Sequence, residues 1–344
     1  MLSREDLLQS HVVTIFADRR WPNETGIGIV MRELEDRMPT NMKAVDLEVK
    51  GSIGSPFSPF AISRSLLGRG SKGVFFSAGF VPPLFCQLPS FVIVHDLTHR
   101  RFYGEAKRIY YDHIYKRLYR RSSGIACVSE FVRSEFLEWS GIAAEKVHLV
   151  YNGVSARFTE YGERHAPGYE YVFYSGNHRN YKNLDRLVRA YAASSLPSRE
   201  IRLVLTGEHN HDLSRRAMEY GIGDKVVFTG IIPVEEMPAY YRGARAVTYM
   251  SSFEGFGLPT LEAFACGTPV ITSNISSMPE VAGGAALLVD PYSVEKMAQG
   301  LDAITTNEEL RHNLIAQGRK RKSDFDWDIS AKLLWKLVRD CAKA

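Results

Sequence analysis

Short apolar segments alternate with longer amphipathic patterns along the chain, and this alternation limits the possible folds more than any other feature. In the first half the apolar segments are 12–17, 73–77, 91–94, 123–128 and 146–151, and in the second half they are 171–175, 201–206, 225–229, 246–250, 269–272 and 286–289. Helical patterns separate many of them, at 27–37, 106–121, 130–140, 184–193, 259–265 and 294–305. Segments that are apolar on both faces and separated by helices are typical of parallel sheets. The sequence therefore predicts an α/β fold.

A polar segment that contains Pro and Gly, residues 161–170, separates two complete alternating series. The length of 344 residues also suits two domains. We therefore expect two Rossmann-like domains, an N-terminal one over residues 1–165 and a C-terminal one over residues 171–325. Residues 326–344 place apolar side chains near helical spacing. This predicts an amphipathic helix that packs against one of the domains, with the first domain as the candidate.

Some classes of protein are not expected from this sequence. No apolar run approaches the ~20 residues that span a bilayer. The N-terminal segment has no basic stretch ahead of an apolar core, so we do not expect secretion. The four cysteines are far apart and form no C-x-x-C pair, which argues against a disulfide framework and against a zinc site. These features favour a cytoplasmic protein.

The strongest functional signal is the segment 254–262, Glu-Gly-Phe-Gly-Leu-Pro-Thr-Leu-Glu, which directly follows the apolar segment 246–250. Its glycines allow a tight turn and a close approach of the backbone to a ligand, and its proline suits the first turn of a helix. Backbone amides at the start of such a helix form an anion site. The amides expected to point outward are those of Phe256, Gly257 and Leu258. A glycine loop between a strand and a helix is typical of nucleotide binding.

Glu254 and Glu262 bracket this loop. A carboxylate beside a phosphate site would repel phosphate, so hydroxyl groups of a sugar and of a ribose are the expected partners. Any single glutamate is more often an ordinary surface charge. The complete arrangement argues against that alternative for this pair.

Continued by Ala263-Phe-Ala-Cys-Gly-Thr-Pro-Val-Ile-Thr-Ser273 and onward to Pro291, this segment resembles the family 4 retaining glycosyltransferases. The resemblance covers most of the chain and is closest from Tyr171 to Pro291. It implies the GT-B fold, in which two Rossmann-like domains have parallel sheets facing a central cleft. It also implies that Glu254 lies by the donor sugar, that Glu262 binds the nucleotide ribose, and that the amides between them hold the diphosphate.

A second strand-to-helix segment, Tyr174-Ser-Gly-Asn-His-Arg-Asn-Tyr-Lys-Asn-Leu184, also matches the family. A cation here would stabilise the charge on a departing diphosphate more in the transition state than in the ground state. The resemblance gives this role to Lys182 and to a preceding basic residue. Arg179 is the nearest candidate, although its spacing departs from the family pattern, and Gly176 is expected at the donor. Taken alone, Lys182 could be an exposed lysine at a helix start.

Three further segments match more weakly. Phe91-Val-Ile-Val-His95-Asp96 places His95 after a strand, where the family commonly has a histidine near the reacting sugar; a structural histidine is the alternative. Gly26-Ile-Gly28 matches the N-terminal glycine loop that approaches donor phosphate and acceptor. Phe228-Thr-Gly-Ile-Ile-Pro233 matches the turn that cradles the nucleotide base, so Ile232 is a donor-binding candidate.

The formal net charge of +4 arises in one half of the chain, because residues 1–165 hold 22 basic and 18 acidic side chains whereas residues 166–344 hold 21 of each. Residues 100–121 contain eight Lys or Arg against Glu105 and Asp112, interleaved with tyrosines. No nucleic-acid recognition motif accompanies this stretch, so we expect no nucleic-acid partner. A helix resting on an anionic membrane surface fits better, with an ordinary solvated helix face as the alternative.

No metal ion and no cofactor are expected. Asp324-Phe-Asp326-Trp-Asp328 has the D-x-D spacing that other glycosyltransferases use for a metal. Here it precedes a terminal helix, and helix capping explains it better. The pairs His209 with His211 and His95 with His99 lack a third ligand at a recognisable spacing.

The sequence thus predicts a retaining hexosyltransferase that uses a nucleotide-sugar donor and a glycan or lipid-linked glycan acceptor in cell-surface polysaccharide biosynthesis. An enzyme of this kind would be cytoplasmic, and peripheral on the inner face of the membrane if the basic stretch contacts lipid. The wider pattern resembles bacterial mannosyltransferases of polysaccharide assembly, which makes GDP-mannose the first choice of donor and a UDP-hexose the second. A nucleotide-sugar epimerase of the same fold and a non-catalytic sugar-nucleotide-binding protein are less favoured functions. A Rossmann dehydrogenase fits poorly, because no third glycine follows Gly28 at the required spacing.

Overall fold

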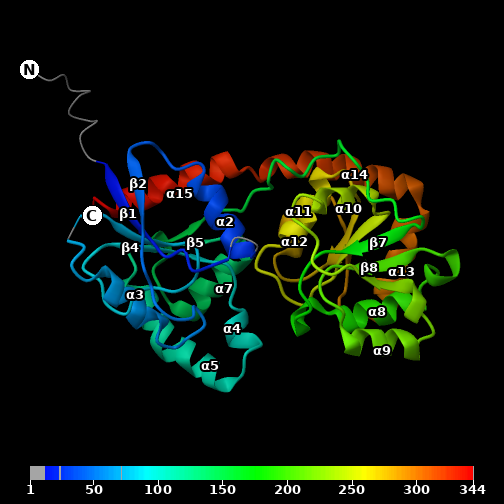
Figure 1. The fold of residues 1–344 in the computed structure, drawn as a ribbon, viewed down its shortest axis with the longest axis horizontal. Helices are drawn as coiled ribbons and strands as arrows, with labels where there is room; N and C mark the ends of the chain where they lie inside the picture. Colours follow the sequence, from blue (N-terminus) through cyan, green and yellow to red (C-terminus); the bar gives the residue numbers. More distant parts are fainter. Residues whose placement is uncertain (1–11, 23–24, 71, 344) are drawn as a thin grey trace, which may run out of the picture. The chain divides into compact units, whose positions relative to one another are not determined.

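The computed structural model describes residues 12–22, 25–70 and 72–343, and the chain divides into two compact units (Figure 1). The first unit runs up to Asn152 and includes the C-terminal segment from Trp327. The second unit runs from Gly153 to Asp326. Each unit contains a six-stranded parallel sheet with helices packed on it, so the predicted α/β fold is confirmed.

The first sheet has the strand order β2-β1-β3-β4-β5-β6. Its strands are β1 (Val13–Ala17), β2 (Met42–Asp46), β3 (Val74–Ser77), β4 (Ser90–Val94), β5 (Gly124–Cys127) and β6 (Val147–Leu149). The helices of this part of the chain are α2 (Gly26–Glu35), α3 (Ser58–Leu66), α4 (Thr98–Arg101), α5 (Glu105–Tyr110), a π-helical segment (Tyr111–Tyr115), α6 (Lys116–Arg121) and α7 (Glu130–Ser140). From β1 the strand order moves to one side to reach β2, and from β3 onward it moves to the other side. The loops after β1 and β3 therefore flank the topological switch point of this sheet.

The second sheet has the order β12-β11-β10-β7-β8-β9. Its strands are β7 (Tyr171–Tyr174), β8 (Arg202–Leu205), β9 (Val226–Phe228), β10 (Ala246–Tyr249), β11 (Val270–Ser273) and β12 (Leu287–Val289). Its helices are α8 (Leu184–Ala193), α9 (His211–Glu219), α10 (Met237–Gly243), α11 (Leu258–Ala265), α12 (Met278–Ala282), α13 (Val294–Thr306) and α14 (Glu308–Arg321). This is the dinucleotide-binding strand order, and its switch point lies between β7 and β10.

The central strands are buried on both faces, and every residue of β4 and of β10 is buried. Such strands appear in the sequence as continuous apolar runs, which is why their positions could be predicted. The strand β2 was not predicted. It lies at the edge of its sheet, and its exposed Lys43 and Asp46 interrupt the apolar pattern.

The division between the units falls upstream of the polar segment 161–170. Residues after Asn152 are already bound to the second unit: the His165 N–H donates to the Ala239 carbonyl at 2.9 Å, and Arg242 donates to the Thr159 carbonyl at 3.0 Å. The ring of Phe158 packs edge-on against Tyr241 with centroids 5.6 Å apart. The polar segment 161–170 therefore packs on the second unit and belongs to it.

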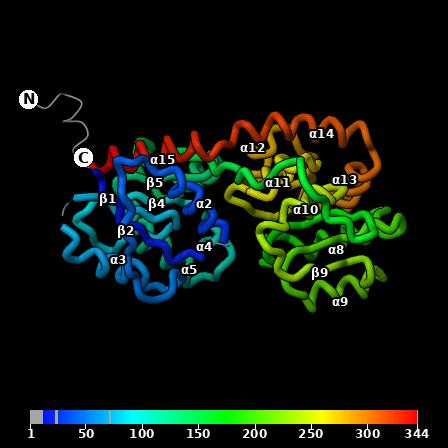
Figure 2. Tube along the Cα trace, turned by 45° about the horizontal axis from the view of Figure 1, so that its top comes forward, coloured from blue at the N-terminus to red at the C-terminus, as the bar shows by residue number. Residues whose placement is uncertain are grey.

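The C-terminal helix α15 (Trp327–Cys341) packs on the first unit, where it contacts α2, β3, β4 and β5 (Figure 2). Trp335 is fully buried, donates its indole N–H to the Leu34 carbonyl at 2.8 Å and lies 5.1 Å from the ring of Phe76. By contrast, Ile329 and Leu333 are exposed. The buried stripe of the helix therefore runs through Trp327, Ala331, Leu334, Trp335 and Val338.

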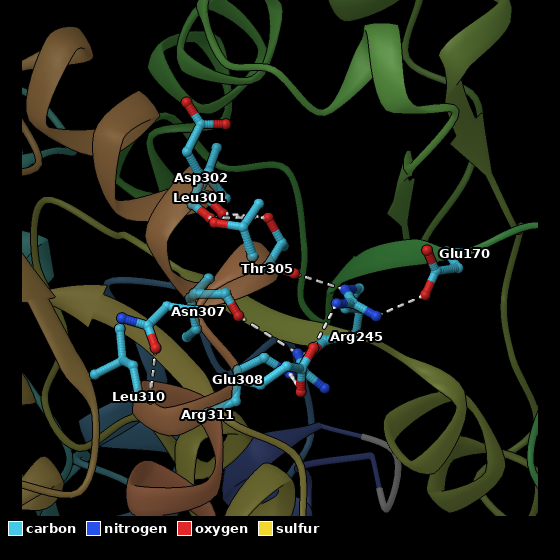
Figure 3. Close-up of polar contacts among 11 residues, drawn as sticks. Glu170, Arg245, Leu301, Asp302, Thr305, Asn307, Glu308, Leu310 and Arg311 are labelled. Carbon is cyan, nitrogen blue, oxygen red and sulfur yellow. Dashed lines mark hydrogen bonds and ion pairs between the residues drawn. The ribbon is translucent and has the colours of Figure 1, made fainter.

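A cluster of hydrogen bonds and ion pairs connects the start of β10 to the neighbouring elements of the second unit (Figure 3). Arg245 donates to the Thr305 carbonyl at 2.8 Å and pairs with Glu170 at 2.8 Å and Glu308 at 2.7 Å. Asn307 caps α14 by accepting from the Leu310 N–H at 2.9 Å. These contacts fix α13 and α14 at the amino end of the strand, away from the edge where α/β sheets bind ligands.

Candidate active site at the carboxyl edge of the second sheet

The loops that carry the two strongest sequence signals leave neighbouring strands. The strand β7 pairs with β10, with Val172 opposite Ala246 and Phe173 opposite Val247. Because both strands end at the same edge, the loop after β7 and the loop after β10 lie side by side. They meet at the topological switch point, which is where open α/β sheets bind nucleotides.

Two side chains from these loops and one from the end of β10 form a buried polar cluster. The ammonium group of Lys182 lies 2.7 Å from Glu254 Oε1 and 2.6 Å from the hydroxyl of Tyr249. The side chains of Lys182 and Glu254 are each only 9% exposed, so this is a buried ion pair. Burial and the adjacent Glu254 carboxylate raise the pKa of Tyr249 well above its usual value, so its hydroxyl keeps its proton. An ammonium group has three N–H donors, and two are directed at these partners.

Backbone contacts hold the two loops together. The Tyr181 carbonyl accepts from the Ser252 N–H at 2.8 Å and from its hydroxyl at 3.0 Å. The side-chain amide of Asn183 donates to the carbonyls of Met250 at 3.0 Å and Pro291 at 2.8 Å. Asn183 has φ of 61°, a left-handed conformation that Asn tolerates better than most residues. The Lys182–Glu254 pair is thus preorganised by the loops that carry it.

The glycine loop ends in α11 as predicted from the sequence. Gly257 precedes the helix with φ of 94°, a conformation that favours glycine, and a Cβ atom there would lie 2.8 Å from Met278 Sδ. Within the described part of the chain no side chain caps α11. Pro259 has no N–H to satisfy, so Leu258 provides the first N–H group of the helix, while the ring of Phe256 is buried against Phe325. This helix start can bind an anion.

Glu262 lies one turn into α11 and accepts a hydrogen bond from the buried hydroxyl of Tyr241 at 2.5 Å. Burial raises the pKa of Glu262 to about 7, and the Tyr241 hydrogen bond and the positive charge of Arg157 oppose this rise only in part. Glu262 therefore exchanges a proton near neutral pH. Its carboxyl group is held in one orientation by a neighbouring helix, α10.

Arg179 is exposed between β7 and α8, with its N–H bonded to Asn177 at 3.2 Å and its guanidinium 3.5 Å from the Tyr181 hydroxyl. The preceding His178, which the sequence did not single out, is better anchored. Its Nε2 lies 2.7 Å from the Thr206 carbonyl, and its ring packs against Phe228. His178 thus joins the loop after β7 to the end of β8.

The remaining donor candidates lie beside that junction. The N–H of Gly176 donates to the Thr206 hydroxyl at 2.9 Å, and a Cβ atom at Gly176 would collide with the hydroxyl of Tyr174. Gly207 and Gly230 form an antiparallel bridge, and partly buried Ile232 follows two residues later. The predicted base-binding turn is therefore at the carboxyl edge of the same sheet.

In the first unit, His95 directly follows β4 and its Nε2 lies 2.6 Å from the Ala78 carbonyl. Burial lowers the pKa of His95, so the imidazole is neutral and donates this bond, which leaves Nδ1 as an acceptor. Asp96 instead accepts from the N–H and hydroxyl of Thr98. Gly26 begins α2 in open surroundings, and the Gly28 N–H is capped by Thr25 at 3.1 Å.

Among the residues that the structure describes, no three His, Cys, Asp or Glu side chains gather as metal ligands. Asp324 pairs with Arg321 at 2.7 Å, and Asp328 pairs with Arg37 at 2.5 Å in the first turn of α15. These aspartates are engaged in ion pairs with neighbouring arginines. The absence of a metal requirement stays a prediction.

Two family models together match nearly the whole chain. Residues 11–158 match the model described as Glycosyltransferase Family 4, and residues 159–321 match the model described as Glycosyl transferases group 1. The chain belongs to glycosyltransferase family 4. The junction of the two models falls close to the division between the two units.

The O-antigen chain mannosyltransferase B of Escherichia coli is 29% identical over 217 residues, which is 59% of this chain and 57% of that protein. The match thus covers little more than half of that relative. Sucrose-phosphate synthase from Thermosynechococcus elongatus superposes with a TM-score of 0.77 at 18% identity, over 95% of this chain and 98% of its own. The Anabaena protein Alr3699/HepE, in complex with UDP and glucose, superposes with a TM-score of 0.74 at 15% identity, over 96% and 100%. The predicted GT-B fold is confirmed.

Proposed function

We propose that this glycosyltransferase moves a hexose, with mannose from GDP-mannose as the first choice, to a hydroxyl group of a glycan or lipid-linked glycan, with retention of anomeric configuration. The single observation that supports a transferase site best is the buried Lys182–Glu254 pair at the switch point between β7 and β10. The choice of mannose rests on the relative named as an O-antigen mannosyltransferase. A role in cell-surface polysaccharide biosynthesis rests on the same name.

In this proposal the donor diphosphate binds at the start of α11, where Leu258 offers a backbone N–H and the helix dipole favours an anion. Lys182 directs its third N–H to the departing phosphate. Charge increases on that phosphate as the sugar bond breaks, so Lys182 stabilises the transition state more than the ground state. Arg179 adds positive charge at the rim.

Glu254 accepts hydrogen bonds from hydroxyl groups of the donor sugar, and ionised Glu262 accepts from the ribose. No first-unit residue singled out from the sequence is a clear covalent nucleophile, so we favour attack on the same face of the sugar, with the leaving phosphate taking the acceptor proton. His95, held by its hydrogen bond to the Ala78 carbonyl, is the first-unit residue that we propose to take part as a neutral polar group. Determining the anomeric configuration of the product by NMR tests this route, and an inverted product contradicts it.

The role of Lys182 is tested with Lys182→Met, and Lys296→Met on the exposed face of α13 is the matched control. We expect the first variant to lose at least a hundredfold in kcat because it removes charge stabilisation from the transition state. The control should keep full activity. Full activity in Lys182→Met would refute the assignment and favour a non-catalytic sugar-nucleotide-binding protein.

The donor is tested by thermal shift with GDP, GDP-mannose, UDP and UDP-glucose. A nucleotide at 100 times its dissociation constant adds about 2.7 kcal/mol of stability, enough to rank the donors. Preference for the uridine nucleotides would favour a UDP-hexose, the ligand class of the structural neighbour that was solved with UDP and glucose. Products formed from the donor alone, without acceptor, would favour an epimerase.

Membrane association through residues 100–121 belongs to the same proposal. None of the helices in the described ranges combines the length and the hydropathy needed to cross a bilayer. Arg117 and Arg121 are exposed on α6, whereas Arg100 pairs with Asp112 and Arg101 with Glu135. The charges left for an anionic surface are therefore fewer than the sequence suggests. We expect Arg117→Glu/Arg121→Glu to bind phosphatidylglycerol vesicles less, with GDP binding unchanged; equal vesicle binding would leave α6 as a solvated helix.

A further inference from the structure

A cavity of about 480 Å³ lies within the first unit, between α4, the π-helical segment, α6 and α7. Its volume is in the range of ordinary small-molecule sites. Six charged side chains line it, three of each sign: Arg100, Arg101, Lys116, Asp112, Glu135 and Glu138. The lining has no net charge, although its basic residues all belong to the basic stretch of the sequence.

Several of these side chains are fixed by contacts with one another. Arg100 Nε lies 2.9 Å from Asp112 Oδ1, and the same oxygen accepts from the indole N–H of Trp139 at 2.7 Å. The guanidinium of Arg100 also lies over the Trp139 ring, 5.1 Å from its centroid. Arg101 is paired with Glu135. The wall of the cavity is therefore a preformed arrangement of donors and acceptors.

One polar atom of this wall has no partner. Glu135 Oε2 is buried, and within the described part of the chain nothing donates a hydrogen bond to it. A buried carboxylate oxygen without a donor costs about 1–3 kcal/mol or more, so such an atom calls for an explanation. The atom is closed to solvent, so a ligand hydroxyl group removes this penalty when the Glu135 side chain turns toward the cavity.

The charges of the wall decide what kind of ligand fits. A phosphate or nucleotide would face three carboxylates, and an apolar ligand would offer no hydrogen bond to any of the charged groups. A neutral polyhydroxy compound satisfies both signs, because each hydroxyl can donate to a carboxylate and accept from Arg or Lys. Among the ligands that a glycosyltransferase binds, a sugar ring has this property.

We propose that this cavity is an acceptor subsite, which binds one sugar unit of the acceptor glycan through its hydroxyl groups. The inference rests on the proposed function for the identity of the acceptor. In it, Glu135 and Glu138 accept from sugar hydroxyls and Lys116 donates to one. Lys116, Arg100 and Arg101 then serve glycan recognition instead of membrane attachment.

The first test measures sugar binding in the absence of any donor, with α-mannobiose, maltose, lactose and chitobiose as probes and NMR titration as the readout. The variants are Glu135→Gln and Lys116→Met. The matched controls are Glu145→Gln and Lys146→Met, which are exposed and lie outside the cavity. We expect at least one disaccharide to bind, and both cavity variants to weaken it at least tenfold, with the controls unchanged. Failure of all four probes to bind, or equal binding by the cavity variants, overturns the proposal.

A second measurement separates this inference from the proposed function. In transfer assays the cavity variants should raise the KM for acceptor at least tenfold and leave the KM for donor and the thermal shift by nucleotide unchanged. If no nucleotide stabilises the protein, the proposed function fails, while the disaccharide titration still decides the subsite. If Lys116→Met reduces binding to phosphatidylglycerol vesicles but not to disaccharides, the cavity is part of a lipid surface and the subsite is refuted.

Discussion

Glu262 is expected to lower the stability of the second unit at neutral pH, and Glu262→Gln should show it. The pKa of this carboxyl group is raised by burial to about 7 in the folded chain, from 4.5. The folded state therefore holds the proton more tightly than the unfolded state does. The stability that this protonated carboxyl group contributes is fully present below pH 4.5, and it is lost as the pH rises through about 7.

The size of the effect follows from the shift. Each pKa unit corresponds to about 1.4 kcal/mol, so the full shift amounts to about 3 kcal/mol as an upper value, because the side chain is only partly buried. Glu262→Gln removes the charge but keeps an oxygen that can accept from Tyr241, 2.5 Å away in the parent. We expect the variant to match the parent at pH 4.5 and to exceed it by as much as this amount at pH 8. Nucleotide affinity should fall in the same variant, because an amide is a weaker acceptor for ribose hydroxyls than a carboxylate.

The tryptophans make the assay selective. All four of them, Trp21, Trp139, Trp327 and Trp335, lie in the first unit. Urea unfolding followed by tryptophan fluorescence therefore reports on the first unit and should be identical in parent and variant. Far-UV circular dichroism also follows the second unit, and its transition should move to higher urea in the variant as the pH rises from 5 to 8.

The matched control is Glu219→Gln, an exposed position at the end of α9, which should give the same difference from the parent at every pH. The reasoning is refuted if Glu262→Gln is less stable than the parent at pH 8. It is also refuted if the difference between the two proteins does not change with pH.

Further outcomes follow from the same site. Gly257→Ala should destabilise the second unit by about 1–3 kcal/mol and weaken nucleotide binding, because φ is 94° and the new Cβ meets Met278; unchanged melting would contradict this. Prior treatment with EDTA should leave transfer activity unchanged, and activity that depends on added Mg²⁺ or Mn²⁺ would show a metal requirement. Glu254→Gln should bind GDP about tenfold more tightly while transferring sugar more slowly, since it leaves the charge of Lys182 uncompensated. Weaker GDP binding by that variant in calorimetry would show that Glu254 does not oppose the diphosphate.

The two parallel sheets could be predicted because their central strands are continuous apolar runs in the sequence. The edge strand β2 could not, since Lys43 and Asp46 face solvent and its sequence resembles a loop. The division between the units was also harder to locate. The segment directly after Asn152 has no apolar run that marks it as part of either unit, but contacts such as that between Phe158 and Tyr241 attach it to the second unit.

The candidate active site could also be predicted only in part from the sequence. Lys182 and Glu254 were found from local motifs, because each motif carries its own strand, loop and helix. Tyr249 and Asn183 were not, because their roles depend on partners 67 residues away or farther. Tyr249 is part of an apolar strand in the sequence, and only the neighbouring register of β7 and β10 brings its hydroxyl to Lys182. Residues whose function is to hold another residue leave little local signal.

In the proposed mechanism, the buried ion pair lets one site bind a charged donor and still promote its cleavage. With Lys182 and Glu254 2.7 Å apart, the pair presents little net charge before the donor binds. Attraction for the diphosphate would then rest mainly on the start of α11, which would act alike on bound donor and on product. If Glu254 engages the sugar as proposed, Lys182 is left to the phosphate, and its stabilisation would grow as charge develops there. Binding energy would thereby be directed toward the transition state, which is the condition for raising kcat without trapping the nucleotide product.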